Sequence, residues 1–254
     1  MSTQGLSISS LVVRYGGLVA VDDVSLTVPP GRVTGLIGPN GAGKTSLFNA
    51  CSGLVRPTAG RIALDGRDMT RLPFARRPQL GLGRTFQRME LFDSLSVRQN
   101  VELGREGVLA GSSPWRQLVA RRSERDVAAQ AADAALSTCG LQAYSDLPAG
   151  ALSTGNRRLV ELARVLAGGF RLLLLDEPSS GLDDRESERF GAILTEVVHD
   201  RGIGILLVEH HMELVLEVCD YLYVLDFGRL LFEGTPDEAV VSDVVRAAYL
   251  GTAA

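Results

Sequence analysis

The first 40 positions alternate between short hydrophobic runs and breaks of proline and glycine. Residues 11–15 and 24–28 are rich in β-branched and aromatic side chains, and residues 32–37 are largely apolar. β-Branched residues bounded by turn residues favour strands, and a continuous apolar run is typical of a strand that is buried on both faces. The pattern predicts strands within residues 6–37 and a further strand at residues 60–66 that ends in a turn.

From about residue 91 to residue 150 the period changes to that of a helix. Between residues 116 and 136, apolar side chains recur at steps of three and four, and arginines and aspartate occupy positions between them. That spacing places the apolar side chains on one face of a helix. Ser112-Ser113-Pro114 contains residue types that begin helices, so we expect a helix to start there.

Strand patterns return in the last third of the chain, at residues 172–175, 203–208 and 221–225. Helical stretches lie between these runs. Strands that alternate with helices are typical of an α/β layer with a parallel sheet, which is the architecture we predict for this half. The sequence contains neither an internal repeat nor a low-complexity segment.

The overall composition is that of an ordinary globular protein. Of the 254 residues, 45% are hydrophobic and 22% are charged, which is enough to bury a substantial core. The formal net charge of −4 argues against a protein that coats nucleic acid, so we expect no nucleic-acid partner.

The three cysteines, Cys51, Cys139 and Cys219, are far apart and form no Cys-x-x-Cys motif. We expect buried free thiols in a reducing compartment, without a disulfide framework or a zinc site. The N-terminus lacks the pattern of a secretory signal, and no stretch approaches the roughly 20 apolar residues of a membrane span. If the protein works at a membrane, we expect another chain to hold it there.

The most specific motif follows the third apolar run. Eight consecutive residues fill every fixed position of the phosphate-binding loop pattern G-x-x-x-x-G-K-[ST]: Gly38, Pro39, Asn40, Gly41, Ala42, Gly43, Lys44 and Thr45. Glycines let successive backbone N–H groups point inward at an anion, and the helix from Ser46 directs its positive dipole end to the same place. A glycine-rich turn can match such a pattern by chance, but the strand before it and the helix after it favour a nucleoside triphosphate site.

Two carboxylates end a second apolar run, residues 172–175. Asp176 would lie at the sheet edge where Mg²⁺ sits, and Glu177 would lie beside the γ-phosphate and polarise an attacking water molecule. The alternative is that both acids only cap the following turn. Because the chain also contains a phosphate loop, we favour the first interpretation, with Lys44 directed at the outer phosphates and the Thr45 hydroxyl on Mg²⁺.

A serine and a glycine open another helix at Leu152-Ser153-Thr154-Gly155-Asn156, which makes a second potential anion site. This segment, then residues 172–178, then Ser180-Gly181-Leu182-Asp183, all behind the phosphate loop, resemble ABC-transporter ATP-binding subunits. The order and the spacing of these motifs are specific to that family, and the resemblance runs from about Leu6 to Gly251.

The resemblance implies roles for further residues. Tyr15 corresponds to an aromatic residue that stacks on adenine, although a strand tyrosine also serves as packing. Gln87 corresponds to a glutamine that contacts Mg²⁺ and the attacking water, although spacing alone would favour a polar turn residue. His210 corresponds to a switch histidine that hydrogen-bonds the γ-phosphate. Ser153, Gly155 and Asp183 belong to the nucleotide-binding motifs.

The implied catalytic residues are therefore Glu177, His210 and Gln87, and the implied Mg²⁺ ligands are Thr45, Gln87 and Asp176. The family's most common signature is Leu-Ser-Gly-Gly-Gln, whereas this chain has Thr154 and Asn156 at the third and fifth positions. Since β-branched residues tolerate positive φ poorly, we expect Thr154 to avoid that region.

The resemblance is strongest to the subfamily that imports branched-chain and other hydrophobic amino acids, through residues 83–87, 91–92, 208–212, 233–236 and 248–251. It implies an α/β fold: an ABC-type phosphate-loop ATPase with an N-terminal antiparallel β subdomain, a parallel-sheet core and a helical subdomain. We expect one domain, with the β subdomain and the first part of the core in residues 6–90, the helical subdomain in 91–150, the second part of the core in 151–240, and a tail in 241–254.

The implied function is ATP hydrolysis that powers import through a partner permease, with the chain peripheral on the cytoplasmic side of the cell membrane. One subunit would supply Lys44 and Glu177, and the opposite subunit would supply Ser153 and Gly155. The implied partners are membrane permease subunits, a second ATP-binding subunit (another copy or a sister chain) and a separate solute-binding protein. The alternatives are a soluble ABC ATPase without a transport role, an importer subunit for another small polar solute such as urea, and a regulatory subunit that hydrolyses poorly.

Overall fold

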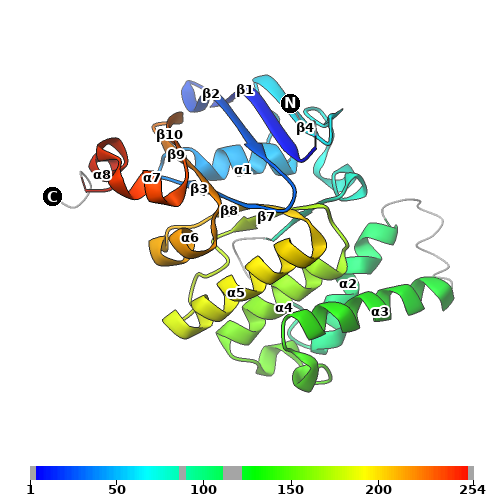
Figure 1. The fold of residues 1–254 in the computed structure, drawn as a ribbon. Helices are drawn as coiled ribbons and strands as arrows, with labels where there is room; N and C mark the ends of the chain where they lie inside the picture. Colours follow the sequence, from blue (N-terminus) through cyan, green and yellow to red (C-terminus); the bar gives the residue numbers. More distant parts are fainter. Residues whose placement is uncertain (1–3, 86–89, 111–121, 251–254) are drawn as a thin grey trace.

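The computed structural model describes residues 4–85, 90–110 and 122–250. An antiparallel sheet lies at the N-terminal end of the molecule, a second sheet crosses the middle, and helices cover the far side of that second sheet (Figure 1). The expected helix start at Ser112-Ser113-Pro114 and the expected site residue Gln87 lie outside the described residues.

The N-terminal sheet is antiparallel, in the order β2-β1-β4-β5. Its strands are β1 (Leu6–Tyr15), β2 (Leu18–Val28), β4 (Ala59–Leu64) and β5 (Arg67–Asp68). The expected β subdomain is therefore present. The two β-rich runs predicted from the sequence are the C-terminal halves of strands about twice that length, because exposed polar residues such as Ser9, Ser10 and Asp23 interrupt the pattern in the N-terminal halves.

The second sheet has the order β10-β9-β3-β8-β7-β6, and every neighbouring pair except β10 with β9 is parallel. Its strands are β3 (Val33–Ile37), β6 (Leu82–Arg84), β7 (Leu172–Asp176), β8 (Gly204–Val208), β9 (Tyr221–Asp226) and β10 (Arg229–Gly234). The predicted parallel sheet is confirmed. Sequence patterns did not predict β6, which has three residues, or β10, whose residues alternate in burial as those of an edge strand do.

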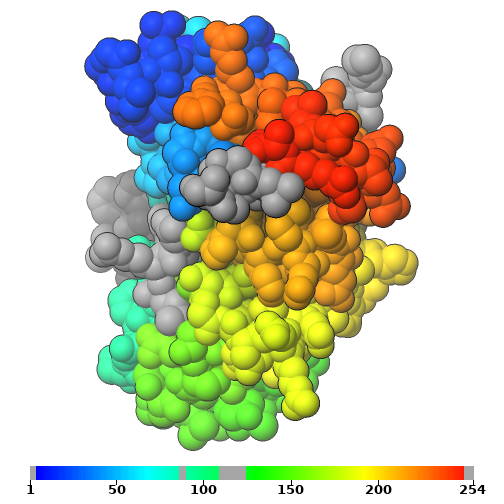
Figure 2. Space-filling view, turned by 90° about the vertical axis from the view of Figure 1, so that its left-hand side faces the viewer, coloured from blue at the N-terminus to red at the C-terminus, as the bar shows by residue number. Residues whose placement is uncertain are grey.

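The helices form two groups. Around the central sheet lie α1 (Lys44–Ser52), α4 (Thr154–Ala167), α5 (Asp184–Arg201), α6 (Met212–Val218), α7 (Pro236–Val241) and α8 (Asp243–Leu250). The other group is α2 (Val97–Ala110) and α3 (Arg122–Thr138), which pack on each other and on α4. In the space-filling view this second group is the green lower part of the molecule, opposite the blue N-terminal sheet (Figure 2).

Both faces of the central sheet are buried, which explains its continuous apolar runs. Along β7, Leu172 and Leu174 belong to a cluster with α1 and the N-terminal sheet, whereas Leu173 and Leu175 belong to a cluster with the helices on the other side. Successive side chains of a strand point to opposite faces, so a strand between two cores needs apolar residues at every position. Cys51, Cys139 and Cys219 are free and buried, as expected, and burial raises the pKa of each thiol to about 12.

Among the described residues, none of the helices is both long enough and apolar enough to cross a lipid bilayer.

A fully buried arginine holds the C-terminal end of α1. The Arg77 side chain is 1% exposed, and its guanidinium donates to the carbonyl oxygens of Leu72, Ala50 and Cys51. The last carbonyls of a helix have no partner within it and carry partial negative charge, so a cation stabilises them. Arg77 directly precedes the 3₁₀ helix Pro78–Leu80, and it thereby ties this segment to the helix that follows the phosphate loop.

Replacement of Arg77 by methionine should lower the free energy of unfolding by about 3 kcal/mol, because it leaves buried carbonyls of α1 without their charged donor. Chemical denaturation measures this change. The matched control is Arg76→Met, which changes the exposed neighbour and should cost less than about 0.5 kcal/mol. Equal effects of the two substitutions would contradict the role assigned to Arg77.

Candidate functional site

The phosphate-loop motif connects the end of β3 to the start of α1, at the carboxyl edge of the parallel strands. Gly38 and Gly43 have φ values of 149° and 100°, which side chains rarely adopt. A Cβ atom on Gly38 would lie 2.2 Å from the carbonyl oxygen of Leu225, and one on Gly43 would lie 2.3 Å from that of Ala20. Both positions therefore require glycine for conformation and for space.

Lys44 is buried at the start of α1 and is held by the loop itself. Its Nζ atom donates to the carbonyl oxygens of Gly38 at 2.6 Å and Pro39 at 3.1 Å. Burial lowers the pKa of Lys44, while the nearby carboxylates of Glu177 and Asp176 raise it. The ammonium group thus lies under the loop, between the loop carbonyls and the two acids.

A cleft of about 360 Å³ opens over this loop. Its walls come from the β1–β2 turn, the loop, the start of α1, Glu177 and the β9–β10 turn, and they consist of Tyr15, Leu18, Val19, Ala20, Asn40, Gly41, Ala42, Gly43, Lys44, Thr45, Ser46, Glu177, Phe227 and Gly228. Tyr15 is 46% exposed, so its ring is available on the surface of the cleft rather than used as packing. Most residues expected to bind the nucleotide are brought together here.

Asp176 ends β7 as the sequence predicted, below the cleft. Its side chain is 3% exposed and lies 3.6 Å from Nη2 of Arg84. Burial raises the pKa of Asp176, and the charge of Arg84 opposes that shift. The pair places a carboxyl oxygen at the carboxyl edge of the sheet together with a cation that favours its ionised form.

Glu177 adopts φ +48°, an uncommon conformation for a residue with a side chain, while its N–H donates to the carbonyl oxygen of Val208 at 2.8 Å. The chain turns sharply at the end of the strand, and the side chain faces the cleft with 27% of its surface exposed. Oε1 of Glu177 lies 4.0 Å from Nδ1 of His210, which follows β8. Two of the three residues expected to act in hydrolysis are therefore neighbours.

Glu209 was not singled out from the sequence, although it precedes His210. It is fully buried, and it accepts hydrogen bonds from the N–H groups of Ser179 at 2.9 Å and His210 at 3.2 Å. These contacts tie the turn that carries His210 to the segment that follows Glu177. Its carboxylate also raises the pKa of Asp176.

The second anion site lies apart from the cleft. Ser153 caps α4 and accepts a hydrogen bond from the N–H of Asn156 at 3.3 Å, and Asp183 caps α5 in a reciprocal pair with Glu186. A Cβ atom on Gly155 would lie 2.1 Å from Oε1 of Glu186, so glycine lets the two helix starts approach each other. Ser153, Gly155 and Asp183 are not among the residues that line the cleft.

Thr154 is the first residue of α4 and is absent from the residues with positive φ, in agreement with the expectation from its β-branched side chain. The helix start therefore accommodates threonine at this signature position.

Arg84 is a residue of this region that the sequence patterns missed. Its Nη1 atom donates to Oδ1 of Asn49 at 2.9 Å and to Oγ of Ser52 at 2.5 Å, and its guanidinium lies 4.6 Å from the centre of the Phe48 ring. Together with the ion pair to Asp176, these contacts join α1, β6 and β7. The sequence feature that could have identified Arg84 is its position, three residues before Gln87.

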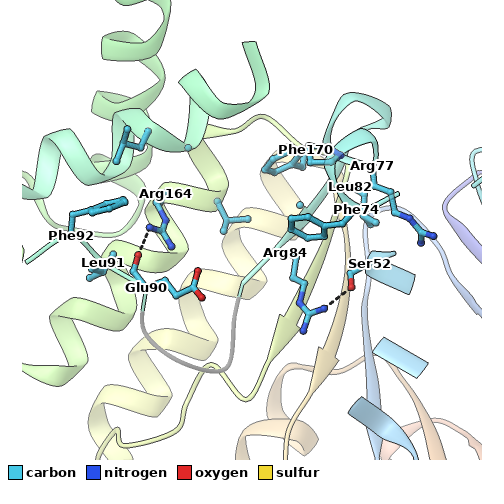
Figure 3. Close-up of a pocket in the computed structure, with 15 residues that line it drawn as sticks. Ser52, Phe74, Arg77, Leu82, Arg84, Glu90, Leu91, Phe92, Arg164 and Phe170 are labelled. Atoms are coloured by element: carbon cyan, nitrogen blue, oxygen red, sulfur yellow. Dashed lines mark hydrogen bonds between the residues drawn. The ribbon is translucent and has the colours of Figure 1, made fainter. Parts of the chain in front are cut away.

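Arg84 also borders a second cavity, of about 490 Å³, between the edge strand β6 and the helices α2 and α4 (Figure 3). Aromatic side chains line it, and Nη1 of Arg164 donates to the carbonyl oxygen of Glu90 at 2.6 Å at its rim. The aromatic lining residues are Phe74, Phe92 and Phe170. Glu90, the first described residue after residues 86–89, also lines this cavity.

Comparison with known proteins identifies the relatives of this chain. Residues 21–180 match the model of the family described as ABC transporter. The chain is 36% identical, over its full length and that of the relative, to BraF of Pseudomonas aeruginosa, a high-affinity branched-chain amino acid transport ATP-binding protein. It is 39% identical to LptB of Acidithiobacillus ferridurans, a lipopolysaccharide export system ATP-binding protein, over 97% of this chain and 96% of LptB.

Among solved structures, the chain resembles the ADP conformation of MJ1267, an ATP-binding cassette of an ABC transporter. The TM-score is 0.86 at 29% identity, and the match covers 98% of this chain and 99% of MJ1267. The fold described above is therefore that of an ATP-binding cassette.

The ion pair between Arg84 and Asp176 should couple the two residues energetically. Arg84→Met leaves the carboxylate buried without its guanidinium, whereas Asp176→Asn leaves Arg84 with Asn49 and Ser52. The cost of the double substitution should therefore fall short of the sum of the single costs by about 2 kcal/mol. Chemical denaturation of the four proteins measures this difference.

The control cycle uses the exposed pair Arg61 and Asp68, whose atoms are 3.1 Å apart and whose side chains are 60% and 53% exposed. Solvent screens this pair, so its coupling should stay below about 1 kcal/mol. Additive costs for Arg84 and Asp176 would show that the buried contact does not join these elements.

Proposed function

This chain belongs to the ABC transporter family, and we propose that it powers the import of branched-chain or other hydrophobic amino acids through a partner permease. As an ATP-binding subunit of that family it binds and hydrolyses ATP. The full-length similarity to BraF supports the amino-acid substrate class. The observation that carries the proposed mechanism is the cleft, in which the phosphate loop, Glu177 and an exposed tyrosine face one another.

In this proposal the loop binds the phosphates of ATP through its inward N–H groups and the dipole of α1. Lys44 exchanges its hydrogen bonds with the loop carbonyls for bonds to the outer phosphates. Tyr15 stacks on the adenine. The loop residues from Gly38 to Ser46 then contact the nucleotide at successive positions along its phosphate chain.

The residues at the cleft fit Mg²⁺. This ion prefers oxygen ligands and keeps several water molecules, so it needs only one or two protein groups in addition to phosphate oxygens. Thr45 is exposed and offers a hydroxyl, and Asp176 offers a carboxylate at the same edge of the sheet. The described residues contain no cluster of three or more His, Cys, Asp or Glu that could hold a metal ion by protein groups alone. When bound, the ion would neutralise phosphate charge during hydrolysis. Gln87 is proposed as a further ligand from its motif alone.

Glu177 is the proposed general base. Its side chain faces the cleft, and a carboxylate near the γ-phosphate can accept a proton from the attacking water. His210, whose Nδ1 atom is 4.0 Å from Glu177, is proposed to donate a hydrogen bond to the γ-phosphate. The buried Glu209 accepts a hydrogen bond from the N–H of His210 and thereby fixes the turn that carries His210 beside Glu177.

The separation of Ser153 and Gly155 from the cleft supports a second ATP-binding subunit. In the proposal these residues complete the cleft of the opposite subunit, with the N-terminal dipole of α4 directed at its phosphates, and Asp183 lies at the same junction. Binding of ATP would then join two subunits, and hydrolysis would release them, which drives the permease by differential binding.

The cavity between β6 and the helices α2 and α4 is the proposed contact of the permease (Figure 3). Its aromatic walls suit the apolar face of a cytoplasmic helix. Since Arg84 reaches from this cavity to Asp176, the contact would lie next to the site of hydrolysis. The chain would thereby be peripheral on the cytoplasmic side of the membrane, and a separate binding protein would select the solute.

The similarity to LptB, at 39% identity over 97% of this chain, supports a second candidate, an export system for lipopolysaccharide. Import and export subunits would use the same cleft. They would differ in the permease that they contact.

The test is co-purification from detergent-solubilised native membranes. Glu177→Gln should bind ATP and Mg²⁺ without turnover and hold the complex together, so we expect a polytopic permease of the amino-acid import class to accompany it. The control, Lys44→Ala with the same ATP, loses the phosphate contact and should retain less of the complex.

Two results would overturn parts of the proposal. Recovery of an export permease would replace amino-acid import by the second candidate. A pure sample without any membrane protein would exclude the transport role and favour a soluble ATPase.

A further inference from the structure

Phe227 is the most exposed large hydrophobic residue among those that the structure describes, with 88% of its surface accessible. It lies in the turn between β9 and β10 and adopts φ +42°. For a bulky residue this conformation is a genuine outlier that strains the backbone, and glycine would adopt it freely. Neither packing nor backbone geometry accounts for a phenylalanine at this position.

The turn that carries Phe227 is fixed to the phosphate loop. The N–H of Gly228 donates to the carbonyl oxygen of Ala42 at 3.0 Å, and the N–H of Asp22 donates to the carbonyl oxygen of Gly228 at 2.8 Å. Nη2 of Arg229 lies 2.6 Å from Oδ2 of Asp22. The phosphate loop and β2 are thus joined to the two residues that follow Phe227, and the orange hairpin of β9 and β10 lies against the blue N-terminal strands (Figure 2).

The order of the sheet places Phe227 at the base end of the cleft. β7, which carries Glu177, lies on one side of β3, beyond β8, and β9 lies directly on the other side. The phosphate loop leaves β3 between them. A nucleotide whose γ-phosphate is directed at Glu177 therefore extends its base toward the turn after β9, where Phe227 and Tyr15 both line the cleft.

We propose that Phe227 is a nucleobase-binding residue that forms an aromatic wall of the base pocket together with Tyr15. This inference rests on the proposed function, since it assumes that the cleft holds ATP. A phenyl ring offers stacking or edge contact but no hydrogen bond. It therefore stabilises a bound purine base without distinguishing adenine from guanine. The anchored turn holds the ring in place before the base arrives, which reduces the entropy lost on binding.

The test is isothermal titration calorimetry with Mg²⁺ in the Glu177→Gln protein, which avoids hydrolysis. Phe227→Gly removes the ring and relieves the positive φ, and Phe227→Asn removes the ring with less added backbone freedom. Both should weaken ATP and GTP binding about tenfold, since base–aromatic stacking contributes at this level. Binding of inorganic tripolyphosphate, which has no base, should stay unchanged.

Two further measurements test whether the Phe227 substitutions act through a general loss of structure. The melting temperature without ligand should not fall in Phe227→Gly, because the substitution removes strain. The matched control is Tyr144→Ala, which removes another exposed aromatic ring from the 3₁₀ helix Gln142–Tyr144, outside the cleft, and should leave the Kd for ATP unchanged.

Unchanged ATP affinity in both Phe227 variants would overturn the inference. Equal losses for ATP and tripolyphosphate would overturn it as well, because the ring would then act on the phosphate loop and not on a base. Failure of the proposed function is distinguishable from both results, since the Glu177→Gln parent itself would then bind no ATP.

Discussion

The pairing of one strand with its two neighbours determines the geometry of the whole site. In the central sheet, Val208 of β8 pairs with Leu36 of β3 on one side and with Asp176 of β7 on the other. Because the strands are parallel, their carboxyl ends meet at one edge, and the segments after each of them emerge side by side. The phosphate loop, Glu177 and His210 come from three distant parts of the sequence, and they become neighbours through this register.

The same edge of the sheet holds several buried charged side chains, and neighbouring polar groups pair with each of them. Lys44 is held by loop carbonyls, Asp176 by Arg84, and Glu209 by the N–H groups of two turns. A buried charge without such partners would be strongly unfavourable. These contacts keep the ionised side chains in position while the cleft remains open above them, which is the pre-organisation that a phosphate-transfer site requires.

Much of this arrangement was predictable because it is encoded locally. The apolar run that ends at Asp176 requires a strand covered on both faces, and the spacing of the loop glycines reflects positive φ angles and close backbone contacts at Gly38 and Gly43. The motif order then led to the family. Strands were predicted at runs rich in β-branched, aromatic or leucine residues, whereas the short edge strand β6 and the alternating β10 carried too weak a pattern.

The contacts that sequence patterns missed all depend on long side chains or on tertiary register. Arg77 and Arg84 are arginines in a segment without periodicity, and only the folded chain shows that one caps α1 and that the other pairs with Asp176. Phe227 is one residue in a short turn, and its strain and exposure are properties of the backbone that surrounds it. A single sequence cannot show which distant partner such a residue meets.

We propose that this sheet edge binds ATP through Lys44 and hydrolyses it through Glu177. The most direct measurement is bound nucleotide and released phosphate, in parallel, for the wild type, Lys44→Ala and Glu177→Gln purified with their complex. We expect turnover in the wild type, no bound ATP in Lys44→Ala, and bound but intact ATP in Glu177→Gln. Phosphate release at the wild-type rate by Glu177→Gln, or ATP retained by Lys44→Ala, would show that these residues do not have the proposed roles.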